Sequence, residues 1–147
     1  MRKQIVRGKD DYRKLIESNA YYVDKTLLIK EFLEYNDEVT LITRPRRFGK
    51  TLNMTMMREY FDITKDSKNI FEGTKIMDTE CVSKMNSIPI VYFSFKNCEG
   101  DTKEELIESF RNVLLEEYAK YYEIFKDDIE KISEMTQVSF MNNMEIL

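Results

Sequence analysis

The sequence contains no histidine, and it has only four glycines, two prolines and two cysteines in 147 residues. Without histidine, the chain cannot use Ser-His-Asp or Cys-His catalysis or bind a metal through imidazole. Cys81 and Cys98 are too few for a disulfide framework or for a zinc site built from cysteines alone. The remaining chemistry is that of carboxylates, lysine, hydroxyl groups and phosphate binding.

Long apolar runs are also missing from the sequence. No stretch approaches the roughly 18 apolar residues of a membrane span, so we expect no membrane partner. The basic first residues are not followed by the apolar stretch of about 7 to 15 residues that a secretory signal needs. The sequence therefore predicts a cytoplasmic protein. Its apolar fraction of 42% is enough for a core, and its length suits one domain.

The net charge is small but unevenly distributed. The 23 lysines and arginines are outnumbered by 27 acidic residues, which gives a formal charge of −4 and argues against a general nucleic-acid binder. Against this background, four basic residues gather in one short stretch, namely Arg44, Arg46, Arg47 and Lys50. This basic cluster is the first local feature that suggests an anionic ligand.

The hydrophobic periodicity predicts alternating helices and strands. Helices are predicted over residues 10–18, 28–33, 50–61 and 102–121, and buried strands over residues 39–43 and 88–95. Asp24 is a plausible cap of the second helix, and Thr102 with Glu105 forms a capping box for the last. The pattern predicts an α/β fold with a parallel sheet covered by helices on both faces. Because two strands are too few for a finished sheet, we expect an incomplete domain.

Residues 44–51 (RPRRFGKT) match the phosphate-loop pattern G-x-x-x-x-G-K-[ST] except at the first position, where Arg44 replaces glycine. In such a loop the backbone N–H groups cradle phosphates, the lysine reaches the β and γ oxygens and the hydroxyl holds Mg²⁺. The predicted strand before the loop and the predicted helix after it provide the required context. The predicted cofactors are ATP and Mg²⁺. The predicted binding residues are Arg46, Arg47, Phe48, Gly49, Lys50, Thr51 and Leu52, with Thr51 as the metal ligand.

Two other interpretations of this loop remain open. Gly49 can simply turn the chain ahead of a helix that begins with a solvated Lys50 and Thr51. Alternatively, the basic cluster can bind nucleic acid, which the overall acidity disfavours. Arg46 and Arg47 suit charge-assisted bonds to a triphosphate and solvation equally well.

The strings YYVDKT (residues 21–26) and VTLITRPRRFGKTLNM (residues 39–54), together with Gly8, Asp11 and Tyr12, closely resemble the AAA-ATPase-like family of bacterial and archaeal P-loop proteins. The string PIVYFSF resembles that family less sharply. RPRRFGKT is the usual form of the loop in this family, so Arg44 fits it. The resemblance implies that Lys50 binds the triphosphate and Thr51 binds Mg²⁺. It also places Asp24 and Lys25 in a family motif, where we favour a helix cap for Asp24.

Members of that family are longer and carry a Walker B strand ending in Asp-Glu. Here the strand predicted over residues 88–95 is followed by Lys96 and Asn97. Residues 1–147 are therefore predicted to form the N-terminal part of a single P-loop domain, truncated before the Walker B strand. No catalytic residue is assigned, and we expect ATP binding with very slow hydrolysis or none. The expected partners are a nucleotide and either a second copy of the chain or the missing C-terminal part.

Overall fold

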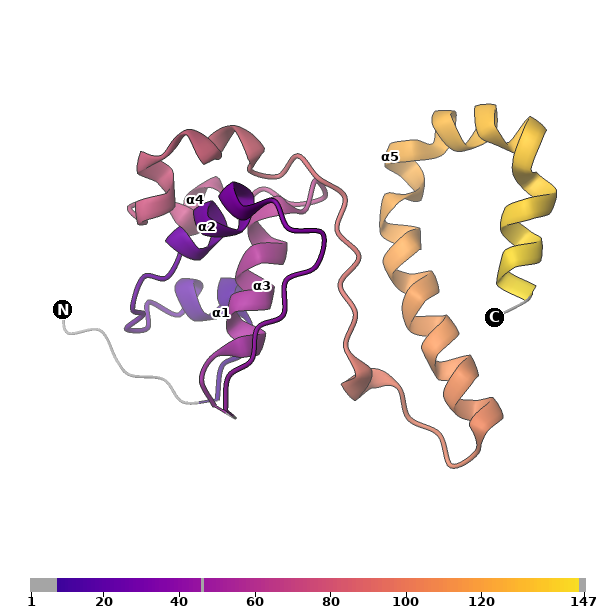
Figure 1. Cartoon of the computed structure of the whole chain (residues 1–147), viewed down its shortest axis with the longest axis horizontal. Coiled ribbons are helices and arrows are strands. Elements are labelled where there is room, and N and C mark those ends of the chain that lie inside the picture. The colour runs from indigo at the N-terminus through magenta and orange to yellow at the C-terminus, as the bar shows by residue number, and fades with distance from the viewer. Residues whose placement is uncertain (1–7, 46, 146–147) are drawn as a thin grey trace. The chain divides into compact units, whose positions relative to one another are not determined.

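The computed structural model describes residues 8–45 and 47–145, and it describes the side chains of these residues except 97, 123 and 127–145. The chain divides into two compact units, Met1–Ile90 and Val91–Leu147 (Figure 1). Each unit is described by itself. The prediction of one domain over residues 1–147 stays a prediction.

The first unit is helical throughout its regular parts. Its elements are α1 (Tyr12–Glu17), α2 (Leu27–Tyr35), α3 (Lys50–Phe61), α4 (Lys68–Phe71) and the 3₁₀ helices η1 (Lys75–Asp78) and η2 (Glu80–Lys84). The predicted helices over residues 10–18, 28–33 and 50–61 are confirmed. Local interactions support these helices. At the start of α1, for example, Asp11 caps the helix by accepting a 2.9 Å hydrogen bond from the Lys14 backbone N–H.

Aromatic side chains hold the first unit together. The ring of Tyr12 from α1 stacks on Phe71 from α4 at 5.1 Å, and the edge of Tyr60 from α3 meets the same Phe71 at 5.2 Å. All three side chains are fully buried. Ile29 of α2 and Ile76 of η1 complete the same core. Since fully burying each large apolar side chain contributes roughly 1.5–3 kcal/mol, this cluster fixes how α1 and α4 pack on α3.

The second unit contains η3 (Phe95–Asn97) and α5 (Lys103–Glu145). The predicted capping box is confirmed: Thr102 Oγ1 accepts from the Glu105 N–H at 3.2 Å, and Glu105 Oε2 accepts from the Thr102 N–H at 3.3 Å. The ring of Phe110 on α5 packs edge-on against Phe93 at 4.7 Å. None of the described helices is both apolar enough and long enough to pass through a membrane.

The predicted three-layer α/β sheet is wrong for the part of the chain that the structure describes. Residues 39–43 form no strand, and Val39 and Leu41 are 84% and 83% exposed, although both were predicted to be buried. Residues 88–95 make one isolated parallel bridge between Ile88 and Asp62, and Phe95 begins η3. β-Branched apolar runs favour extended backbone, but a sheet also needs a neighbouring strand to supply the hydrogen bonds. Neither segment pairs with the other, so local propensity alone produced no sheet.

Candidate nucleotide site

The loop predicted to bind phosphate leads directly into α3. Gly49 stands immediately before the helix with φ 76° and ψ 23°, which is the left-handed conformation that glycine adopts without steric cost. Arg47 also has a positive φ, of 69°, which is uncommon for a residue with a side chain. The chain therefore turns sharply between residues 47 and 49 and then begins the helix at Lys50. The predicted order of loop and helix is confirmed, and only the preceding strand is wrong.

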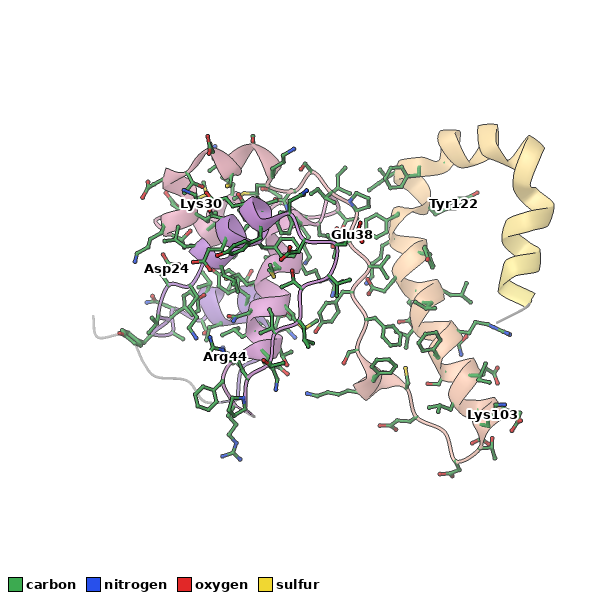
Figure 2. The ribbon with its side chains drawn as sticks, viewed as in Figure 1. Asp24, Lys30, Glu38, Arg44, Lys103 and Tyr122 are labelled. Carbon is green, nitrogen blue, oxygen red and sulfur yellow. The ribbon has the colours of Figure 1, made fainter. Side chains whose placement is uncertain are left out.

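The Lys50 side chain folds back across this loop. Its Nζ donates a hydrogen bond to the backbone carbonyl oxygen of Arg44, six residues earlier. Figure 2 shows Arg44 near the start of α3. The contact holds the Lys50 ammonium group beside the backbone of Arg44, at the start of the loop. A cation is thereby fixed at the positive end of a helix dipole, where it favours an anionic ligand.

The first turn of α3 has free backbone donors. No side chain caps its N-terminus, and the first intrahelical bond runs from the Asn53 N–H to the Gly49 carbonyl oxygen at 2.9 Å. The N–H groups of Lys50, Thr51 and Leu52 therefore have no hydrogen-bond partner within the described part of the chain. Unsatisfied N–H groups at a helix start are suited to binding phosphate oxygens.

The remaining predicted site residues differ in their surroundings. Thr51 is half-buried next to Lys50, so its hydroxyl lies on the same helical turn as the free donors. Leu52 packs its side chain against the core and contributes only its backbone to the site. Phe48 and Arg47 are exposed, the former to 61%. Arg46 lies outside the described residues.

These residues could bind Mg²⁺ only together with a phosphate that supplies further oxygen ligands. Within the described residues, no group of three or more acidic, cysteine or histidine side chains could hold a metal. Thr51 supplies one hydroxyl oxygen. Mg²⁺ usually keeps several waters and takes further oxygens from substrate phosphates, so one protein ligand suffices in such a site.

Asp24 of the YYVDKT motif has a structural role that sequence reasoning missed. Its Oδ1 accepts from the backbone N–H of Thr26 at 2.8 Å and from the Thr26 hydroxyl at 2.7 Å, and its Oδ2 accepts from the Lys75 N–H at 2.8 Å. The Thr26 hydroxyl accepts in turn from the Ile76 N–H at 3.2 Å. The predicted helix cap is wrong in detail, because Thr26 is the N-cap residue of α2 and Asp24 ties that cap to η1. Lys25 is exposed.

These bonds also set the charge state of Asp24. Partial burial alone would raise the pKa of the Asp24 carboxyl, but the hydrogen bonds from Thr26 and from the Lys75 backbone outweigh it and lower the pKa. The carboxylate is therefore ionised when it joins α2 to η1.

We expect Asp24→Ala to lower the free energy of unfolding by about 1–3 kcal/mol, because it leaves the backbone N–H and the hydroxyl of the buried Thr26 without their acceptor. Asp24→Asn keeps one oxygen acceptor and should lose less. Urea denaturation followed by circular dichroism measures both variants. Equal denaturation midpoints for wild type and Asp24→Ala would show that the hydrogen bonds of Asp24 to Thr26 and Lys75 contribute nothing to stability.

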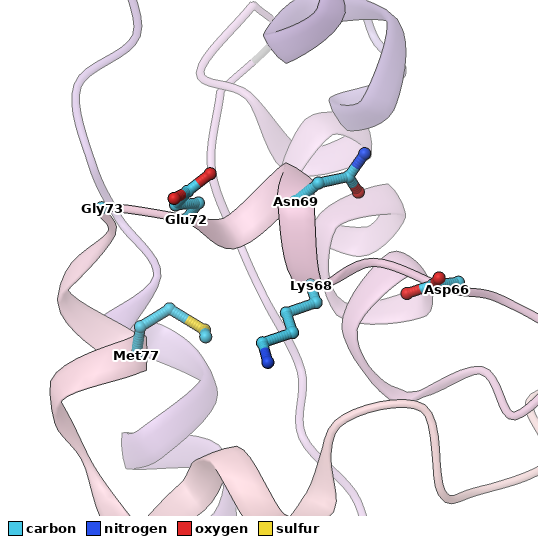
Figure 3. Close-up of a pocket in the computed structure, with 6 residues that line it drawn as sticks. All are labelled: Asp66, Lys68, Asn69, Glu72, Gly73 and Met77. Carbon is cyan, nitrogen blue, oxygen red and sulfur yellow. The ribbon is translucent and has the colours of Figure 1, made fainter.

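A pocket of about 550 Å³ lies elsewhere in the first unit, and no residue of the loop lines it. It is lined by Asp66, Lys68, Asn69, Glu72, Gly73 and Met77 (Figure 3). In Figure 3 the side chains of Lys68 and Met77 extend toward one another, whereas the Asp66 and Glu72 carboxylates are directed elsewhere. Because its charges do not converge, this pocket is a weaker candidate than the loop at α3.

Comparison with known proteins agrees with the motifs around this loop. Residues 7–145 match the AAA-ATPase-like family, whose description is "Predicted AAA-ATPase". No curated protein and no solved structure matches the chain. The matched range contains both strings on which the resemblance rests, at residues 21–26 and 39–54. Since the match covers nearly the whole sequence, the chain belongs to the AAA-ATPase-like family.

Proposed function

We propose that the chain binds ATP or a closely related nucleotide, with the phosphates seated on the first turn of α3. The observation that carries this proposal is the free N-terminal turn of α3 together with the Lys50 ammonium group held at the same end of that helix. Both favour negative charge at one place. Membership of a family of predicted AAA-ATPases supports the same function.

Each residue of the loop has a distinct task in this proposal. Gly49 adopts a φ of 76°, and among the described residues beyond its chain neighbours no heavy atom lies within 4 Å of the place where a Cβ would stand, so the backbone is open to a phosphate. Lys50 exchanges the Arg44 carbonyl for a phosphate oxygen, which is the stronger acceptor because it is charged. The Thr51 hydroxyl serves as the protein ligand of a phosphate-bound Mg²⁺.

Titration with a fluorescent ATP analogue in the presence of Mg²⁺ tests the proposal. If the phosphates provide most of the contacts, ATP and tripolyphosphate should displace the analogue, AMP should displace it poorly, and chelation of Mg²⁺ should weaken binding. Competition by AMP as strong as that by ATP would contradict a phosphate site. An absence of saturable binding would contradict the function itself.

Nucleic-acid binding is the alternative, and the exposed side chains of Arg44 and Arg47 favour it. The two functions differ in their dependence on salt and on competitor. A nucleic acid held by several phosphate contacts loses affinity steeply as salt increases, because counterions are released on binding. Binding of a labelled oligonucleotide that is steeply salt-dependent and insensitive to Mg·ATP would favour this alternative.

A further inference from the structure

One hydroxyl group joins the first half of α3 to the chain around the start of α1. The Oγ1 atom of Thr55 accepts a hydrogen bond from the Tyr12 backbone N–H at 3.2 Å. The same atom lies 3.0 Å from the carbonyl oxygens of Asp10 and of Leu52, and it donates its single proton to one of them at a time. α1 lies beside α3 in the fold (Figure 1). Thr55 therefore ties α3 to a segment that is more distant in sequence than the phosphate loop.

Thr55 lies one helical turn beyond the residues of the candidate nucleotide site. Residues four apart lie on the same face of a helix, so Thr55 follows Thr51 along α3. The Leu52 carbonyl, which can accept from the Thr55 hydroxyl, belongs to the first turn itself. A hydrogen bond at Thr55 therefore acts on the turn whose backbone N–H groups are free.

The start of α3 has few other hydrogen bonds within the described part of the chain. No side chain caps its N-terminus, and the Lys50 side chain bonds to the loop itself. Of residues 50–55, Thr55 alone forms a side-chain hydrogen bond to α1 or to the described residues before it. Leu52 packs against the core on an adjacent side of the same turn. Because helix ends fray, a bond that holds the first two turns in place affects how their N–H groups are presented.

We propose that Thr55 is a positioning residue of the nucleotide site. Its hydroxyl holds the first two turns of α3 against residues 10–12, which keeps the N–H groups of residues 50–52 in the orientation that phosphate oxygens require. Donors that are ordered before binding lose less conformational entropy when the ligand arrives. This inference rests on the proposed nucleotide function. Thr55 acts through the helix and makes no contact with the phosphates.

Thr55→Ala separates the hydroxyl from helix formation. Alanine has a higher helix propensity than threonine, so this variant favours the helix while it removes the hydrogen bonds. If Thr55 only supported the helix, the variant would bind the fluorescent ATP analogue at least as well as wild type. We expect it instead to bind roughly 3- to 10-fold more weakly, which corresponds to the loss of one hydrogen bond. Thr55→Val should lose as much, whereas Thr55→Ser keeps the hydroxyl and should stay within about twofold of wild type.

Hydrogen exchange of the nucleotide-free chain provides a second measurement that a uniform loss of stability would not reproduce. In Thr55→Ala, exchange should accelerate more at amides 53–56 than at amides 57–61, because only the start of the helix is released. Thr64→Ala is the matched control. It removes a hydroxyl that donates to Asp62 Oδ1 at 2.7 Å beyond the other end of α3, and it should change neither the affinity nor the exchange of amides 53–56.

The outcomes distinguish this proposal from the function on which it rests. Circular dichroism verifies that each variant retains its helices. Wild-type affinity in Thr55→Ala and Thr55→Val overturns the positioning role while the nucleotide site stands. So does an equal acceleration of exchange along the whole of α3, or a loss of affinity that Thr55→Ser shares. A wild-type chain that binds neither ATP nor tripolyphosphate overturns the nucleotide site itself, and the positioning role with it.

Discussion

Lys50→Ala is expected to weaken binding of a fluorescent ATP analogue by roughly 10- to 100-fold. The estimate corresponds to the loss of one charge-assisted hydrogen bond to phosphate, which contributes about 1.5–3 kcal/mol. In the structure the ammonium group of Lys50 is already held beside the loop by the Arg44 carbonyl, so little ordering is needed before it meets a phosphate. Titration of wild type and variant under identical salt and Mg²⁺ conditions measures the difference.

A matched control separates this effect from a general loss of positive charge. Lys25 is exposed and lies outside the loop, in residues 21–26, so Lys25→Ala removes one charge without changing the loop. It should leave affinity within about twofold of wild type, because an exposed charge that makes no contact with the ligand is largely screened by salt. Equal affinity for wild type and Lys50→Ala would contradict the site. An equal loss in both lysine variants would show that net charge, and no defined site, controls binding.

The loop and its helix could be predicted because their signals are local. Gly49, Lys50 and Thr51 are adjacent, and the apolar spacing that defines α3 begins within the same turn. A glycine in the left-handed conformation before a helix needs no distant residue to specify it. The same reasoning explains the capping box of Thr102 and Glu105, which are three residues apart.

The lack of a sheet among the described residues and the role of Asp24 could not be predicted from local patterns, because both depend on residues far away in the sequence. Residues 39–43 have the composition of a strand, but a strand also requires a partner that composition does not specify. Asp24 resembles a helix cap, but one of its oxygens accepts from the backbone of Lys75, 51 positions later. Hydrogen bonds to a distant backbone N–H carry no sequence signature, since almost every residue has that group.

A buried ionic cluster in the first unit was also missed at the sequence level. Glu59 of α3 is only 4% exposed, and its carboxylate accepts from Arg13 Nε at 2.9 Å and from the Ser67 hydroxyl at 2.7 Å. Lys65 Nζ lies 3.0 Å from its other oxygen. On the sequence, Glu59 is one acidic residue among the apolar positions of a helix. The fold brings its cations to it from α1 and from the loop before α4, so the cluster connects three segments.

Glu59→Ala is expected to lower the free energy of unfolding by about 2–4 kcal/mol. It leaves the two cations, Arg13 and Lys65, without their shared acceptor, and removing one partner of a buried ion pair costs about 3–5 kcal/mol. Both cations retain some exposure to water, which reduces the penalty. Glu34→Ala on α2 is the matched control, since Glu34 pairs with Lys30 at 3.4 Å on the exposed surface and should change stability by less than about 1 kcal/mol. Urea denaturation at neutral pH measures both variants.

The stabilisation by Glu59 should also depend on pH in a defined direction. Burial alone would raise the pKa of the Glu59 carboxyl, but hydrogen bonds from Arg13, Ser67 and Lys65 lower it below the ordinary glutamate value of 4.5. A carboxyl whose pKa is lower in the folded chain stabilises the fold fully above its unfolded pKa, and this contribution is lost as the pH falls through the folded value. The difference in stability between wild type and Glu59→Gln should therefore be constant above the ordinary value and shrink progressively below it. A difference that stays constant down to the acid unfolding of both proteins would show that Glu59 stabilises the fold by packing and neutral hydrogen bonds, without a contribution from its charge.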